Sequence, residues 1–283
     1  MNKIKSFFLV VLLLSFPFLA SAGTKTAQVR VILAPKKVGP GDLLLVTVKN
    51  AGGPVEGAFD GKKIYFNPSQ NSSKAIVGID LFTEPGTYDL KITCNGAALR
   101  RSVVVSKKKY PVQRLKLPKD MVELTPENEA RVEREQKKMA AIWPIRTDRH
   151  WTGDFTNPRE GEIVTTFGVK RFMNNIPKSP HTGVDVSADE GDEVYAPNSG
   201  VVSLVDDLYY SGNSIVLDHG QGIFTMFFHL SKILVVPGQT VKKGDVIGLV
   251  GSTGRATGPH LHWGARVLDA RVDPLELIHL DLE

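Results

Sequence analysis

The 283 residues are enough for about two domains, and 42% hydrophobic with 23% charged residues predict a packed globular protein. The net charge of +5 is too small to indicate a nucleic-acid partner, so we expect none. The single cysteine, Cys94, excludes an intramolecular disulfide and a metal site built from cysteines.

The first 22 residues have the pattern of a secretory signal peptide. Lys3 and Lys5 give a positive start, residues 7–19 are apolar, and Ala-Ser-Ala at 20–22 matches an A-x-A cleavage site. The apolar run is too short to span a bilayer, so we expect no stable membrane anchor after cleavage. The mature protein is predicted to be exported, to the periplasm or to the cell wall and extracellular space.

Residues 23–107 are predicted to form a β-sandwich. Glycine- and proline-rich turns separate short apolar segments at the spacing of a sandwich, and residues 85–88 resemble a corner of bacterial immunoglobulin-like domains. No constellation of His, Asp or Glu occurs in this part, so we expect a binding or spacer module. The expected strands are 27–33, 43–49, 63–66, 75–80, 87–94 and 99–106.

Residues 108–157 are predicted to be a linker that contains one helix. Thr125 is a suitable N-cap, Pro126 fits the first helical position, and Glu127 places an acid in the first turn. The expected helix at 127–141 is mostly charged and has no sustained apolar stripe, so it should lie on the surface of a domain. Its few apolar contacts would come from Val132, Met139 and Ile142.

Residues 158–283 are predicted to form an antiparallel β domain, which makes the fold class all-β. Fifteen of the 26 glycines lie between Gly161 and Gly264, and they indicate many tight turns between short strands. Residues 218–222 have the composition of a hairpin turn, and no long amphipathic helix is evident. The expected strands are 163–167, 184–187, 193–196, 200–206, 213–218, 223–229, 246–251 and 261–267.

Three histidines in this last part lie on or beside predicted strands. His260 and His262 are two residues apart, so on a strand both imidazoles face one side with Cα atoms about 6.5–7 Å apart. His229 ends another apolar strand, where it could face the same site.

A further histidine and a carboxylate precede them. His181 and Asp185 would have Cα atoms about 13 Å apart on a straight strand. Ligand atoms on one zinc ion lie within roughly 3.5 Å of each other, so a shared metal requires the chain to bend. Gly183 permits that bend. Val184 and Val186 should then face the core while Asp185 faces the site.

These residue types are suited to hydrolysis at a metal. Two histidines and one carboxylate make an open zinc site with three protein ligands and water in the fourth position. The two remaining histidines would serve as acid, base or oxyanion stabiliser. Spacing alone leaves open which of the four histidines does which.

Four segments, in this order, closely resemble the motifs of the lysostaphin-type zinc metallopeptidases, the LytM domain. They are His-Thr-Gly-Val-Asp at 181–185, Phe-His-Leu-Ser at 228–231, Gly-Ser-Thr-Gly at 251–254 and Thr-Gly-Pro-His-Leu-His at 257–262, within about residues 160–270. The resemblance implies that His181, Asp185 and His262 bind one zinc ion per chain. It implies that His229 and His260 are catalytic and flank the metal-bound water. The implied activity is that of a zinc metalloendopeptidase that hydrolyses peptide cross-links between the stem peptides of bacterial peptidoglycan.

Two alternatives remain. A non-haem Fe(II) oxygenase also uses two histidines and a carboxylate, but it would leave His229 and His260 without a role. A catalytically inactive LytM-type module would bind the wall or activate another wall hydrolase, and loss of a ligand would be its mark. All five positions are filled here. We assign no role to His219, which we expect in the hairpin turn, or to His279.

Overall fold

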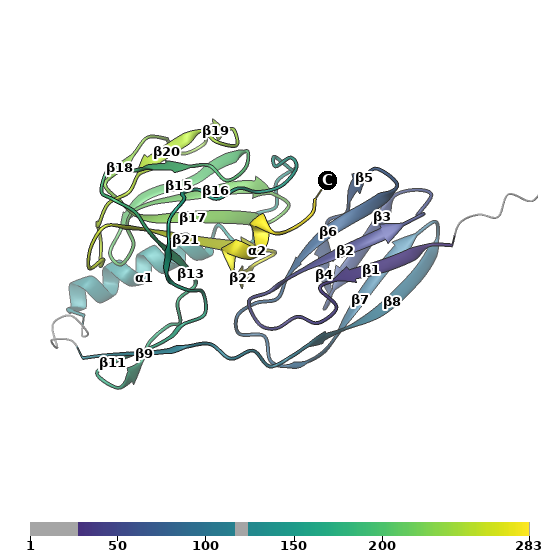
Figure 1. Cartoon of the computed structure of the whole chain (residues 1–283), viewed down its shortest axis with the longest axis horizontal. Coiled ribbons are helices and arrows are strands. Elements are labelled where there is room, and N and C mark those ends of the chain that lie inside the picture. Colours follow the sequence, from purple (N-terminus) through teal and green to yellow (C-terminus); the bar gives the residue numbers. More distant parts are fainter. Residues whose placement is uncertain (1–27, 117–123, 283) are drawn as a thin grey trace, which may run out of the picture.

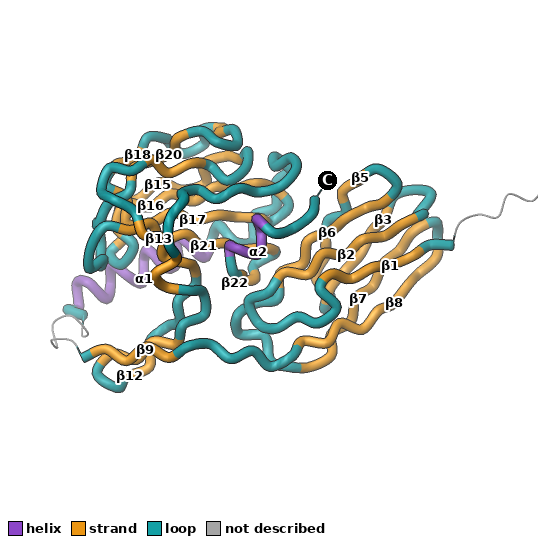
Figure 2. Tube along the Cα trace, in the orientation of Figure 1, coloured by secondary structure: helices purple, strands orange, loops and turns teal. Residues whose placement is uncertain are grey.

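The computed structural model describes residues 28–116 and 124–282, so the predicted signal peptide lies outside the described residues. As predicted, the chain is mostly β, and Figure 1 shows two groups of strands with the C-terminus between them. The trace in Figure 2 is helical only over α1 (Pro126–Ala140) and the short α2 (Pro274–Ile278). In the part of the chain that is described, no helix is long and apolar enough to span a membrane.

The N-terminal group consists of two four-stranded sheets, in agreement with the predicted sandwich. In β7, Leu90, Ile92 and Cys94 alternate with exposed residues and are buried in the core, as expected for a strand with one solvent-facing side. The likeness to immunoglobulin domains stays a prediction. One sheet has the order β1 (Arg30–Ala34), β2 (Leu43–Lys49), β6 (Ser72–Gly78), β5 (Asn67–Ser69); the other is β4 (Lys62–Ile64), β3 (Val55–Phe59), β7 (Gly86–Cys94), β8 (Ala97–Val105).

The C-terminal group is built on an eight-stranded antiparallel sheet. Apolar residues on one face, among them Val184, Phe227 and Trp263, pack with residues of a smaller three-stranded sheet to form a single core. The large sheet has the order β10 (Ile163–Thr165), β13 (Gly183–Ser187), β21 (His260–Val267), β17 (Ile223–Leu230), β16 (Gly212–Gly220), β15 (Gly200–Leu208), β19 (Thr240–Val241), and β22 (Ala270–Val272) pairs with β21. The smaller sheet is β14 (Glu193–Tyr195), β20 (Val246–Leu249), β18 (Lys232–Ile233).

The predicted linker contributes a strand as well as a helix. β9 (Val112–Leu115) pairs in parallel with β11 (Lys170–Met173), and β12 (Ile176–Pro177) completes this small sheet. The strands within residues 158–283 pair antiparallel with one another, as predicted, and the parallel pair of β9 and β11 joins this part to the segment that precedes it. Neither strand has an alternating apolar pattern, and their pairing joins segments far apart in the sequence. The boundaries of the predicted domains, 23–107, 108–157 and 158–283, stay predictions.

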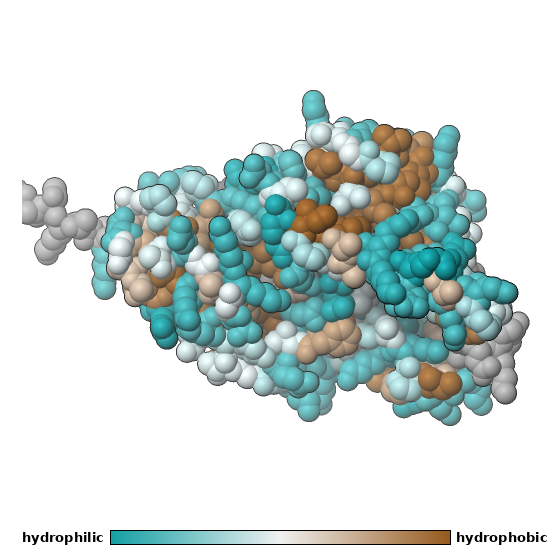
Figure 3. All heavy atoms as spheres, turned by 180° about the vertical axis from the view of Figure 1, so that it is seen from behind, coloured by the Kyte–Doolittle hydropathy of each residue, from teal (hydrophilic) through white to brown (hydrophobic). Residues whose placement is uncertain are grey.

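Helix α1 packs on the large sheet, on the face opposite to the Trp263 core. It begins one residue before the predicted start, and the Thr125 hydroxyl caps it by accepting a hydrogen bond from the Asn128 N–H at 3.3 Å. Val132 is buried, and Ile142 beyond the helix end joins Phe224 in a small apolar cluster. Figure 3, seen from behind, shows a mostly hydrophilic surface with one larger hydrophobic patch on the half that holds this sheet.

The two groups of strands share part of one core. Gly78 of β6 lies so close to the second group that a Cβ there would be 2.7 Å from the Val267 carbonyl oxygen. The Asp80 carboxylate accepts hydrogen bonds from the backbone N–H and the guanidinium of Arg271 at 2.8 and 3.0 Å. The side-chain amides of Asn67 and Gln221 exchange two hydrogen bonds of 2.9 Å. These contacts hold the second group in a defined position beside the first.

His219 lies in β16, not in the hairpin turn as predicted. The turn consists of Gln221 and Gly222, whose φ angles of 55° and 78° match a two-residue hairpin loop. The His219 ring is fully buried; its Nδ1–H donates to the Ser199 carbonyl and its Nε2 accepts from the Thr225 hydroxyl, both at 2.8 Å. Burial lowers the pKa of His219 to about 4, so it is a neutral core residue.

This histidine should make the protein less stable in acid. The pKa of His219 is about 4 when folded and about 6.5 when unfolded, so between these values only the unfolded chain binds the proton. The contribution of His219 to the free energy of unfolding therefore falls as the pH falls through that window, by roughly 3 kcal/mol in total. His219→Asn keeps a donor toward Ser199 without the titration. Urea unfolding should show the stability gap between the parent and this variant narrowing from pH 7 to pH 4.5; a constant gap would contradict the account.

Candidate metal centre

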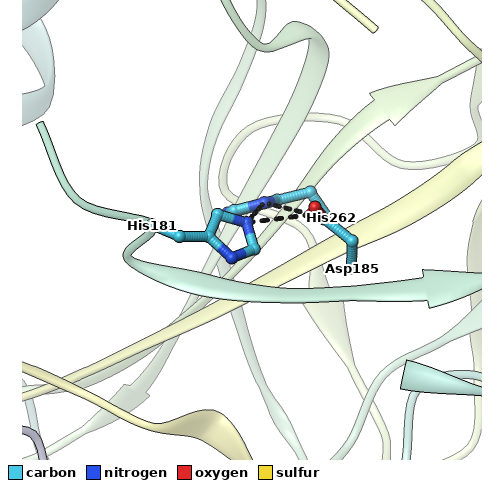
Figure 4. A group of neighbouring side chains, drawn as sticks. All are labelled: His181, Asp185 and His262. Carbon is cyan, nitrogen blue, oxygen red and sulfur yellow. Dashed lines mark hydrogen bonds and ion pairs between the residues drawn. The ribbon is translucent and has the colours of Figure 1, made fainter. Parts of the chain in front are cut away.

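The structure brings His181, Asp185 and His262 together. Strands β13 and β21 pair so that Asp185 lies directly opposite His262, and His181 immediately precedes β13. The His181 Nε2 atom is 3.0 Å from Asp185 Oδ1 and 3.0 Å from His262 Nδ1, and His262 Nδ1 is 2.9 Å from Asp185 Oδ1. All three side chains are buried, and Figure 4 shows their polar ends pointing at one another.

Gly183 is required beside this cluster, although for a different reason than the predicted bend. Its φ is not in the left-handed region, so its conformational freedom is not what the site uses. A Cβ at Gly183 would lie 2.4 Å from the Trp263 carbonyl oxygen and 2.6 Å from His262 Nε2. The glycine therefore leaves room for the imidazole of His262. Val184 and Val186 are buried in the core, as expected.

Backbone carbonyl groups orient three of the imidazoles. A carbonyl oxygen only accepts hydrogen bonds, so the ring Nδ1 facing it must carry the proton, and a neutral ring then has its lone pair on Nε2. In each case this leaves Nε2 available to the site. The pairs are His181 with Thr166 at 2.9 Å, His229 with Thr253 at 2.8 Å and His260 with Gly258 at 2.9 Å.

The cluster has the chemistry of a cation site. Burial alone would raise the pKa of Asp185, but the close approach of the His181 and His262 rings outweighs it and holds that pKa well below its usual range. Burial lowers the pKa of His262 to about 4, so its ring is neutral at pH 7. Two imidazoles, when neutral, and a carboxylate can direct three lone-pair atoms, all within 4.8 Å of one another, at one point. These residues fit zinc, which prefers nitrogen and carboxylate ligands in this number when one position stays open.

The two other predicted histidines lie beside the cluster. The ring centroids of His229 and His260 are 4.9 Å apart, and His260 Nε2 is 3.8 Å from Asp185 Oδ1. His229 has a φ of 64°, a left-handed conformation that is strained for a residue with a side chain, and its N–H donates to the Ser211 carbonyl at 2.8 Å. Burial lowers the pKa of His229. All five residues predicted from the sequence therefore meet in one site.

Sequence reasoning missed two side chains of this site. The ring of Phe228 stacks on His262 at a centroid distance of 5.2 Å and an interplanar angle of 8°. The Arg171 guanidinium, from β11, has Nη2 3.7 Å from Asp185 Oδ2. Phe228 could have been singled out because it belongs to a recognised motif, whereas Arg171 lies in a segment with no strand pattern and no motif.

A carboxylate and two imidazoles on an antiparallel sheet, with two further histidines beside them, are typical of a mononuclear metallohydrolase. Residues 179–274 match the model of peptidase family M23. The crystal structure of a Pseudomonas aeruginosa protein assigned to peptidase M23 has a TM-score of 0.68 and 32% identity, and the match covers 85% of this chain and 94% of that one. The chain belongs to peptidase family M23, which confirms the resemblance seen in the motifs.

Curated relatives are similar over the same part of the chain. The peptidoglycan DD-endopeptidase ShyA of Vibrio cholerae is 48% identical over 85 residues, which are 30% of this chain and 20% of that protein. The DD-carboxypeptidase/endopeptidase Mpg of Neisseria meningitidis is 41% identical over 97 residues, 34% of this chain and 22% of that protein. The match thus spans about a fifth of the length of these relatives.

The close approach at Gly183 can be tested by adding one methyl group. Gly183→Ala should lower the free energy of unfolding by about 1–3 kcal/mol, the usual cost of overpacking, because the new Cβ would meet the His262 ring. Gly86→Ala is the matched control, since its Cβ would be no closer than 3.7 Å to the atoms around it. Chemical denaturation of both variants gives the comparison. Equal effects would show that Gly183 is not constrained by its neighbours.

Proposed function

We propose that the protein is an exported zinc metalloendopeptidase that hydrolyses peptide cross-links of bacterial peptidoglycan. The observation that carries the proposal is the convergence of His181 Nε2, Asp185 Oδ1 and His262 Nδ1 within hydrogen-bond distance of one another. Membership of peptidase family M23 supports peptide-bond hydrolysis. Relatives named as peptidoglycan DD-endopeptidases support the substrate class, and the signal-peptide pattern supports export.

His181, Asp185 and His262 would hold one zinc ion per chain. When bound, zinc lowers the pKa of a water molecule toward 7 and polarises a carbonyl group. The protein holds the ligand side chains in place before the metal arrives. The Thr166 carbonyl directs His181 through Nδ1, the pairing of β13 with β21 positions the carboxylate, and Phe228 covers one face of the His262 ring.

His229 and His260 are proposed as the proton-transfer groups. Each ring has its Nδ1–H engaged by a backbone carbonyl, so Nε2 is the atom that can accept a proton from the attacking water. Burial lowers the pKa of His229, which keeps that ring neutral and ready to accept at pH 7. A protonated Nε2 can then donate to the leaving amine or to the oxyanion. The strain at His229 indicates that its position is maintained at a cost.

The catalytically inactive module is the less favoured function. All five side chains are present, and the described contacts bring them together. An Fe(II) oxygenase would give His229 and His260 no task, and the family is one of peptidases. For residues 23–107 we propose a binding or spacer role.

The roles of the five residues predict two separate outcomes in alanine variants. His181→Ala, Asp185→Ala and His262→Ala should lose zinc and activity together, because each removes a ligand. His229→Ala and His260→Ala should retain about one zinc per chain while turnover falls roughly 10²–10⁴-fold, the scale of a lost acid–base group. Zinc content by elemental analysis and release of cross-linked peptides give the two readouts.

Two results would change this assignment. Loss of zinc in His260→Ala with retention in His262→Ala would reverse the roles within the pair. Full turnover in His229→Ala would remove its catalytic role. If the parent protein returns iron, or takes up no metal after reconstitution with zinc, the proposed activity itself fails.

A further inference from the structure

Arg171 has an unusual place beside the metal centre. Its guanidinium Nη2 lies 3.7 Å from Asp185 Oδ2, which is too far for a hydrogen bond. Its Nε atom is buried and has no hydrogen-bond partner among the described residues. The side chain is 29% exposed, so the guanidinium is mostly covered by protein but still reaches solvent.

The part of the guanidinium that reaches solvent has donors that a ligand can use. An arginine has five N–H donors in a rigid fork, and buried donors without partners lose the hydrogen bonds that water would give them. Burial lowers the pKa of Arg171, against the opposing effect of Asp185, yet an arginine stays charged at neutral pH. Asp185 does not satisfy the fork, because its Oδ2 is 3.7 Å from Arg171 Nη2, beyond hydrogen-bond distance.

The charge around Arg171 favours an anion. Among the described residues, Arg171 has one ion-pair contact, and this is with Asp185. The carboxylate and the guanidinium cancel, so a divalent cation held by the cluster would leave the site with a net charge of about +2, with neutral histidines. A negatively charged part of the substrate is therefore attracted to this side of the site.

We propose that Arg171 binds a free carboxylate of the substrate peptide beside the bond that is cleaved, an inference that rests on the proposed function. The guanidinium fork matches the two oxygens of a carboxylate. Arg171 faces Asp185 Oδ2, whereas the ligand atoms converge on Oδ1, so the guanidinium is set aside from the reacting centre. It is a specificity-determining residue that distinguishes a peptide with a free carboxylate from one in which that group is amidated.

The test uses two cross-linked peptides that differ in one group. One has a free carboxylate on the residue beside the scissile bond, and the other has a primary carboxamide there. The zinc-loaded full chain should show a lower KM for the acid. Arg171→Gln should raise KM for the acid about 10- to 100-fold, the scale of a lost charge-assisted hydrogen bond, with little change for the amide, in kcat or in zinc content.

Two further variants distinguish recognition by the guanidinium fork from attraction by positive charge alone. Arg171→Lys keeps the charge without the fork and should give an intermediate KM for the acid. Lys170→Gln removes one positive charge from the adjacent, exposed position of β11, whose side chain points to the other face, and should leave both KM values unchanged.

Three results would overturn the proposal. An equal fall in kcat for both peptides in Arg171→Gln would make Arg171 a transition-state stabiliser. Loss of zinc in that variant would make Arg171 a support for Asp185. An equal effect of Lys170→Gln would show that only the positive charge of this region matters. Failure of the proposed function would be distinct, since the parent would cleave neither peptide. In that case, calorimetric titration of the parent and of Arg171→Gln with the two peptides measures the preference for a carboxylate. Equal affinities of the parent for the acid and the amide would exclude carboxylate binding by Arg171.

Discussion

The pairing of β13 with β21 is the interaction on which the site depends. It places Asp185 opposite His262, with Val184 opposite Trp263 on the other face of the sheet. Because side chains alternate along a strand, a shift of one residue would turn the carboxylate into the apolar core and the valine toward the site. The fully buried Val184 and Trp263 therefore hold the register, and the hydrophobic core defines where the proposed metal ligands meet.

Hydrogen bonds to the backbone orient the histidine rings of the site. Carbonyl groups of Thr166, Thr253 and Gly258 each engage Nδ1 of one histidine, so Nε2 of each of the three rings is left without a backbone partner. Ring orientation thus comes from loops that precede or face the strands, held in turn by the packed sheets. Such preorganisation holds the proposed proton-transfer groups and the proposed ligands in position.

The sequence predicted the parts of this structure that leave a local pattern. Alternating apolar residues located the strands that carry Asp185 and His262, and Thr125 with Pro126 marked the start of α1. It could not predict the parallel pairing of β9 with β11, since neither strand has an apolar period and the pairing depends on the folded chain. For the same reason Arg171 went unnoticed. His219 was misplaced because its glycine neighbours resemble a turn, whereas the turn itself begins two residues later, at Gln221.

The central claim is that one zinc ion is held by His181, Asp185 and His262 and by no other histidine. Anomalous diffraction from crystals of the zinc-loaded protein, recorded on both sides of the zinc absorption edge, tests it most directly. The account predicts one anomalous peak per chain, within about 2.0–2.2 Å of His181 Nε2, Asp185 Oδ1 and His262 Nδ1. A peak coordinated by His229 or His260, or no peak in this site, would contradict it.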